Sequence, residues 1–215
     1  GKVGVMEAII IAQRCQMPVL SIDYRMPPEH PFPAGLEDVV TVYQHLLKDH
    51  PATSMTLGGT SAGGGLILTA TSKLNELGVD VPGALYAGTP WTDLTKTGDS
   101  YITNEGVDRL LITYDGLLAG AARLYAGAHD LKDPLLSPVY GEFHGFPPTF
   151  LVTGTRDLFL SNTARAHTKL RASGVVADLL VFEGVSHGDY AFEATSPESM
   201  QTYTELNAFL LQHLQ

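Results

Sequence analysis

Short apolar runs alternate with longer amphipathic stretches along this chain, and few folds accommodate that pattern. Five runs of five or six residues have the composition of buried strands, and stretches with helical spacing of apolar residues separate most of them. Strands connected through helices lie parallel, because each crossover carries the chain back to the same end of the sheet. We therefore expect a three-layer α/β domain over residues 1–215. The predicted strands are 19–24, 55–60, 84–88, 149–153 and 177–182, and the predicted helices are 3–16, 35–48, 62–77, 162–172 and 198–214.

The composition excludes several classes of protein. Hydrophobic residues make up 44% of the 215 residues and charged residues 17%, which suits a large core and not a disordered chain. The net charge of −10 would repel a phosphate backbone, so nucleic acid is not an expected partner. The single cysteine, Cys15, excludes an internal disulfide and a thiolate cluster for zinc, and we expect it to pack on a helix. No apolar run approaches the ~20 residues of a membrane span and no secretory leader is visible, so we expect a soluble cytoplasmic protein.

Residues 89–146 interrupt the alternation. This segment is rich in Gly, Thr, Asp and Tyr, and only about residues 108–125 have helical spacing. A connection this long between two core strands is more often a functional excursion than a passive loop. We expect it to form a lid or another functional excursion.

A serine follows the strand predicted at 55–60, in the string G-T-S-A-G over residues 59–63. A serine on a tight turn between a strand and a helix is typical of the nucleophile of a hydrolase. The start of the following helix also provides free N–H groups, so we expect the backbone N–H of Ala62 to face a developing oxyanion. The alternative for Ser61 is a glycine-rich turn that only packs a helix against the sheet.

Two further strand ends carry groups that could act with Ser61. Asp157 follows the strand predicted at 149–153, and His187 lies on a glycine-flanked loop after 177–182. Alone, Asp157 could be an Asx turn or a helix cap, and His187 a solvated loop residue. The chain order serine, acid, histidine is that of α/β hydrolases. We therefore expect the three residues to meet at the carboxyl edge of the sheet as a catalytic triad.

Longer strings carry a resemblance to a known family. They are D-Y-R-M-P-P-E-H-P-F-P-A over 23–34, G-T-S-A-G-G over 59–64, D-P-L-L-S-P over 133–138 and G-F-P-P over 145–148. Together they resemble the bacterial hormone-sensitive-lipase-like (family IV) carboxylesterases, in the branch with Thr before the serine. The resemblance implies an α/β-hydrolase fold with a mostly parallel sheet. It also implies hydrolysis of short-chain acyl esters or lactones through an acyl-enzyme, without a metal or an organic cofactor.

The resemblance extends to residues outside the triad, and it implies that residues 89–146 form a small helical cap and part of the pocket wall. Trp91 and Tyr190 are candidate residues of the substrate pocket, although core packing explains each of them equally well. Arg25 and Glu29 could pair and hold the proline-rich loop in place. The run 175–182 is a candidate edge strand that is apolar enough to pair with a second copy, so we expect a possible homodimer through it.

One motif of the family is absent. Its members carry H-G-G-G upstream of D-Y-R, and the glycine N–H groups form most of the oxyanion hole, but nothing like it precedes Asp23. The strand that bears this motif would lie between 19–24 and 55–60, so we expect this sequence to be the C-terminal part of a longer protein. The function expected first is that of a serine carboxylesterase acting on a small-molecule ester. The alternatives are a catalytically silent hydrolase-like protein that binds a small molecule, and a peptidase or amidase on the same fold.

Overall fold

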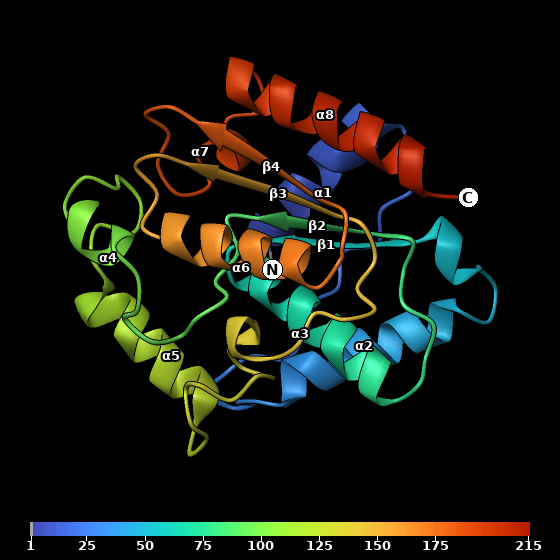
Figure 1. Ribbon diagram of the computed structural model, residues 1–215, viewed down its shortest axis with the longest axis horizontal. Coiled ribbons are helices and arrows are strands. Elements are labelled where there is room, and N and C mark those ends of the chain that lie inside the picture. The colour runs from blue at the N-terminus through green and yellow to red at the C-terminus, as the bar shows by residue number, and fades with distance from the viewer. Residues whose placement is uncertain (1) are drawn as a thin grey trace.

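The computed structural model describes residues 2–215, and a parallel four-stranded sheet lies at its centre (Figure 1). The order β1-β2-β3-β4 follows the chain, because each helical crossover places the next strand beside the last one. Four of the five predicted strands are thereby confirmed. The observed strands are β1 (Thr56–Thr60), β2 (Ala84–Gly88), β3 (Thr149–Gly154) and β4 (Ala177–Phe182).

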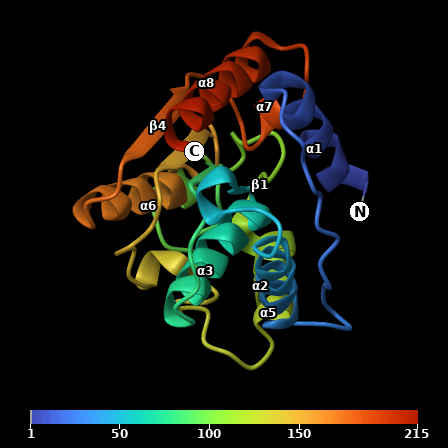
Figure 2. The same ribbon diagram turned by 90° about the vertical axis from the view of Figure 1, so that its right-hand side faces the viewer.

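Helices cover both faces of the sheet (Figures 1 and 2). Helices α3 (Ala62–Glu76) and α6 (Leu160–Ala172) pack on one face, and α2 (Ala34–Leu46) packs on α3. Helix α8 (Pro197–His213) covers the other face together with α1 (Lys2–Cys15). This arrangement is the expected three-layer α/β architecture.

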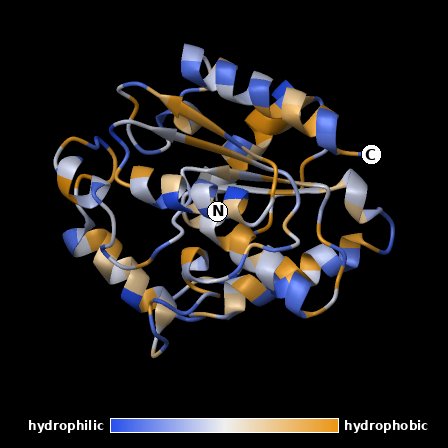
Figure 3. Cartoon of the chain, viewed as in Figure 1, coloured by the Kyte–Doolittle hydropathy of each residue, from blue (hydrophilic) through white to orange (hydrophobic). Residues whose placement is uncertain are grey.

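The two central strands divide their side chains between two cores. Tyr86 and Phe150 face the side of α1 and α8, whereas Leu85 and Leu151 face α3 and α6, because successive residues of a strand point to opposite faces. Every residue of β2 and β3 is buried, which is typical of central parallel strands. Figure 3 shows the apolar residues gathered on the strands and hydrophilic residues on the outer surface of α8.

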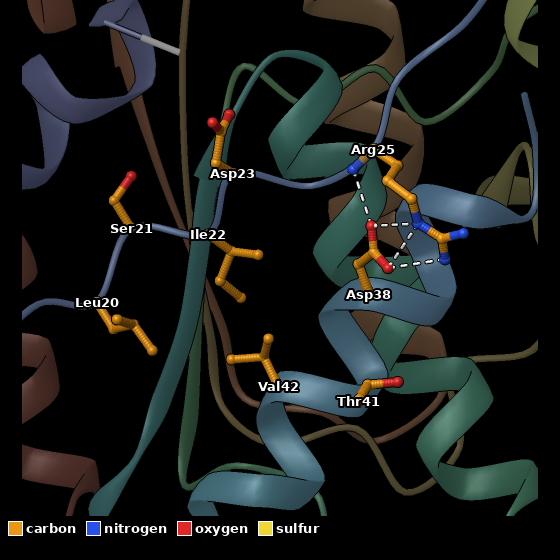
Figure 4. A pocket seen from close by; sticks show the side chains of 8 residues that line it. All are labelled: Leu20, Ser21, Ile22, Asp23, Arg25, Asp38, Thr41 and Val42. Carbon is orange, nitrogen blue, oxygen red and sulfur yellow. Dashed lines mark hydrogen bonds and ion pairs between the residues drawn. The ribbon is translucent and has the colours of Figure 1, made fainter. Parts of the chain in front are cut away.

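The strand predicted at 19–24 is wrong. Residues 16–26 contain neither helix nor strand and run along the side of the molecule (Figure 2). A cavity of about 450 Å³ lies between this segment and α2, lined by Leu20 and Ile22 on one side and Val42 on the other (Figure 4). A strand forms only where a neighbour pairs with its backbone groups, and among residues 2–215 no strand pairs with this segment.

The expected pairing of Arg25 with Glu29 is also wrong. The guanidinium of Arg25 binds Asp38 of α2, with Nη2 2.8 Å from Oδ1 and Nε 3.0 Å from both carboxylate oxygens (Figure 4). The backbone N–H of Arg25 donates to Asp38 Oδ2 as well, at 2.8 Å. The proline-rich loop is therefore held to α2 instead of to itself.

Residues 89–146 form an irregular excursion with its own apolar cluster around Tyr101, Tyr114 and Phe159. The helix predicted from about residue 108 begins later, because Asp108 Oδ1 accepts the N–H groups of Leu110 and Leu111 and turns the chain instead. The elements of the excursion are α4 (Ser100–Thr103), η2 (Tyr114–Leu118), α5 (Ala119–Ala126) and η3 (Pro138–Tyr140).

A membrane-crossing helix would need both length and apolar character, and none of the helices between residues 2 and 215 combines the two.

Candidate active site

Ser61 occupies a strained turn between β1 and α3. Its backbone φ is 60° and ψ is −120°, a conformation that a residue with a side chain rarely adopts. Hydrogen bonds hold it there, because its N–H donates to Gly88 O at 2.8 Å and its carbonyl accepts the N–H of Trp91 at 2.9 Å. A Cβ on Gly59 would lie 2.6 Å from the backbone of Gly63, which explains the glycine at position 59. The turn presents the Ser61 hydroxyl at the carboxyl edge of the sheet.

His187 and Asp157 lie beside Ser61, as the sequence predicts. The Nε2 atom of His187 is 2.9 Å from Ser61 Oγ, although the two residues are 126 positions apart. Its Nδ1 atom is 3.0 Å from Asp157 Oδ1. Both His187 and Asp157 are buried, and the ring of Phe159 packs edge-on against the imidazole at 4.8 Å between ring centroids. The three side chains thus form one hydrogen-bonded chain at the ends of three strands.

The environment of Asp157 favours its charged form. Burial raises the pKa of this carboxyl, but the charge and hydrogen bond of His187, the Thr89 hydroxyl and the Phe159 N–H lower it further, so the net pKa lies below its ordinary value. The Phe159 N–H donates to Oδ1 at 2.7 Å, and Thr153 Oγ1 donates to Oδ2 at 2.9 Å. A carboxylate held in this way can orient an imidazole and stabilise its protonated form.

Ala62 is the first residue of α3, directly after Ser61. Within residues 2–215 its backbone N–H has no hydrogen-bond partner, as expected for the first turn of a helix. A free N–H beside the serine, at the positive end of the helix dipole, is suited to an oxyanion.

The two candidate pocket residues are packing residues in the structure. Tyr190 is only 1% exposed and belongs to the core between the sheet and α8, with its hydroxyl 3.2 Å from that of Tyr86. The structure therefore does not support a pocket role for Tyr190. Trp91 stacks on Phe159 at 5.2 Å between centroids and joins the apolar cluster of the excursion.

Thr89 is a site residue that the sequence analysis missed. It directly follows β2, and its hydroxyl contacts both Asp157 and His187. A signal was present, because Thr89 stands at the carboxyl end of a strand like the other three residues of the site.

The sequence analysis also missed Glu7 of α1, which contacts Thr60, the residue directly before Ser61. Its Oε1 atom accepts hydrogen bonds from Thr60 Oγ1 at 2.7 Å, Tyr86 OH at 2.8 Å and Tyr203 OH at 3.2 Å. Burial raises the pKa of this carboxyl, and the three hydrogen bonds offset only part of that rise. Nothing in the helical pattern around Glu7 distinguishes it from a solvent-facing glutamate, because its partners come from distant strands and helices.

A strand-to-helix serine bonded to an imidazole, which in turn bonds a carboxylate at the edge of a parallel sheet, defines the class of α/β hydrolases. A model of the family with the alpha/beta hydrolase fold matches residues 7–191, and the chain belongs to this family. Within it, the chain is a hormone-sensitive-lipase-like protein of the bacterial type, as its sequence motifs indicate.

Named relatives support this placement. An acetyl-hydrolase of Streptomyces hygroscopicus is 32% identical over 193 residues, which cover 89% of this chain and 64% of the relative. Among solved structures, esterase E25 is 61% identical with a TM-score of 0.98, over 100% of this chain and 66% of that one. An esterase from the bacterial hormone-sensitive lipase family is 35% identical with a TM-score of 0.91, over 96% of this chain and 69% of that one. The chain therefore spans about two thirds of the length of these relatives.

Proposed function

We propose that this protein is a serine carboxylesterase that hydrolyses short-chain acyl esters or lactones. The observation that carries the proposal is the 2.9 Å contact between Ser61 Oγ and His187 Nε2, with Asp157 on the opposite side of the imidazole. The relatives are named acetyl-hydrolase and esterase, and these names support the same chemistry. No step of this chemistry requires a metal or an organic cofactor.

In this mechanism His187 Nε2 takes the proton of Ser61 as Oγ attacks the ester carbonyl. The tetrahedral intermediate collapses when the same imidazole gives its proton to the leaving alkoxide, and an acyl-enzyme remains on Ser61. Water then attacks the acyl group, His187 takes a proton from it, and the acid is released as Ser61 recovers its proton. Asp157 orients the imidazole and stabilises its positive charge in both steps.

The oxyanion of the intermediate needs more than the one donor that Ala62 provides. In the family that this chain resembles, glycine N–H groups of the H-G-G-G motif supply such donors. A single donor of this kind is worth about 10²–10³ in turnover.

The decisive test is hydrolysis of p-nitrophenyl butyrate by the protein and by its Ser61→Ala variant. Loss of the nucleophile should lower turnover by at least about 10⁴-fold while the melting temperature is retained. The matched control is Ser54→Ala, which removes an exposed hydroxyl just before β1, at the opposite end of that strand from Ser61. An acyl-length series then identifies the preferred ester, and a matched anilide tests the amidase alternative.

A catalytically silent binding protein is the second candidate, and it is favoured because we identify only one oxyanion donor, the Ala62 N–H, within residues 2–215. In that case the parent and Ser61→Ala are equally inert, and both bind a small ester or acid in a calorimetric titration. Equal activity of the parent and Ser61→Ala would contradict the serine mechanism itself.

We also propose a homodimer through β4, the strand at the opposite edge of the sheet from β1. Val181 on this strand and Val176 just before it are exposed by 43% and 53%, and an apolar exposed edge favours pairing with a second copy. Sedimentation should report a dimer at micromolar concentration and a monomer for Val181→Lys. A monomeric parent under these conditions contradicts the proposal.

A further inference from the structure

Thr89 occupies a position between the acid and the base of the site. Its Oγ1 atom donates a hydrogen bond to Asp157 Oδ2 and lies 3.0 Å from His187 Nδ1. The side chain is fully buried, so no solvent competes for these contacts. Its backbone N–H donates to Val152 O at 2.7 Å, which extends the pairing of β2 with β3 by one residue.

The backbone of Thr89 is strained. Its φ is 35°, in the left-handed region that a β-branched residue almost never adopts. Such strain persists only where surrounding interactions hold it, and it concentrates at functional sites. Glycine would relieve the strain at this position but would remove the hydroxyl.

Which of these groups donates and which accepts follows from the number of protons that each group carries. An ionised Asp157 has only acceptors, and a hydroxyl has one proton and two lone pairs. The Thr89 proton therefore goes to Asp157 Oδ2, which leaves a lone pair of Oγ1 directed at His187 Nδ1. Two acceptors then face Nδ1, since Asp157 Oδ1 lies at the same 3.0 Å distance.

We propose that Thr89 is a positioning residue that keeps the proton of His187 on Nδ1, and so leaves Nε2 free to accept the proton of Ser61. This inference rests on the proposed esterase function. Thr89 acts through the imidazole and does not touch the reacting ester. Because two acceptors flank Nδ1, the ring is held in one orientation as well as in one tautomer.

The tautomer is read directly from the ¹⁵N and ¹H spectra of histidine side chains in ¹⁵N-labelled protein, with His187 assigned through its loss in His187→Gln. In the parent and in Thr89→Ser, His187 should show protonated Nδ1 and unprotonated Nε2. In Thr89→Val the spectrum should move to a mixture of tautomers. Thr89→Gly serves as a second variant, because it lacks the hydroxyl and suits a positive φ.

Thr153→Val is the matched control. Thr153 Oγ1 donates to the same Asp157 Oδ2 atom at 2.9 Å but has no contact with His187. Its removal should leave the Nδ1 tautomer of His187 in place. Identical spectra for Thr89→Gly and the parent, or identical changes for Thr153→Val and Thr89→Val, would overturn the proposal.

Ester turnover gives the second readout. We expect Thr89→Val and Thr89→Gly to lower kcat by about tenfold, the order of one hydrogen bond to a charged group, with KM unchanged and with recovery in Thr89→Ser. A parent without any ester turnover contradicts the proposed function, whereas the spectra still decide the role of Thr89. A fall in kcat for Thr89→Ser equal to that for Thr89→Val also overturns the proposal.

Discussion

Arg109 and Asp189 form an ion pair that joins the excursion at 89–146 to the loop that carries His187. The Nη2 atom of Arg109 lies 2.6 Å from Asp189 Oδ2, and the same oxygen accepts the N–H of Ser186 at 3.0 Å. The N–H of Arg109 donates to Ser186 Oγ at 3.1 Å. Asp189 therefore binds both the excursion and the loop that carries His187.

Arg109→Ala should loosen the histidine loop without unfolding the protein. The Arg109 side chain is 73% exposed, and exposed ion pairs contribute little to the free energy of unfolding. We expect an unchanged melting temperature, a lower kcat on p-nitrophenyl butyrate, and a weaker effect of salt on kcat than in the parent. Lys96→Ala, which removes another exposed ion pair, is the control. A large fall in melting temperature for Arg109→Ala would show that the pair is structural instead.

Asp157→Asn should abolish most of the esterase activity and leave the folded structure nearly unchanged. The amide would offer an N–H to an imidazole that needs an acceptor, so His187 turns to the wrong tautomer for Ser61. A reversed tautomer of this kind lowers kcat by about 10⁴-fold in a Ser-His-Asp site. The kcat of Asp157→Asn should therefore approach that of Ser61→Ala, and a variant within tenfold of the parent would remove Asp157 from the mechanism.

Glu7 should make the protein less stable as the pH rises. Burial places the pKa of its carboxyl in the folded protein above the ordinary value of 4.5, so the folded state holds this proton more tightly than the unfolded state. That contribution to stability is complete below the unfolded pKa and is lost as the pH rises through the folded pKa. The melting temperature of Glu7→Gln relative to the parent should therefore increase from about pH 4.5 upward.

The control for Glu7 is Glu142→Gln, which changes an exposed glutamate. Its melting temperature relative to the parent should stay constant over the same pH range. A constant difference for Glu7→Gln as well would mean that Glu7 titrates like a solvated carboxyl.

Arg165→Met should destabilise the protein strongly. Arg165 Nη1 lies 2.7 Å from Asp93 Oδ2, and the Asp93 side chain is fully buried at the base of the excursion. Removing one partner of a buried ion pair leaves an uncompensated charge and costs about 3–5 kcal/mol. Because the Arg165 side chain is 32% exposed, we expect the lower end of that range in urea unfolding.

The double variant Asp93→Asn/Arg165→Met should recover part of this loss, because no unpaired charge remains. Strictly additive effects of the two substitutions would show that the ion pair has no coupling energy.

The central strands were predictable because helices cover both faces of the sheet, and a strand buried on both faces needs a continuous apolar run. β2 and β4 have the predicted bounds, since both faces of β2 are covered and β4 ends at Phe182, two residues before Gly184, a turn residue with φ of 74°. The segment at 19–24 has a similar run of residues but forms no strand. Its secondary structure depends on a neighbouring backbone, and a pattern of side chains carries no information about that neighbour.

The residues of the candidate site also divide into those that the sequence predicted and those that only the structure revealed. Ser61, Asp157 and His187 were predictable because each follows a strand, and parallel strands end at one edge of the sheet. Tyr190 was open between two roles, and only the packing of α7 (Asp189–Phe192) against α8 places it in the core. Glu7 lies 53 positions from Thr60 and 196 from Tyr203, so no local pattern could connect them.

The amino-acid sequence by itself determined the order of strands and helices, the identity of the three side chains that meet at the candidate site, and the family. These follow from local periodicity, turn chemistry and motif strings, which are properties of short stretches of chain. Only the tertiary structure decided that Arg25 binds Asp38, that Thr89 lies between Asp157 and His187, and that Glu7 is held by three hydroxyls. Hydrogen bonds act over about 3 Å, and that proximity exists only once the sheet has brought distant segments together.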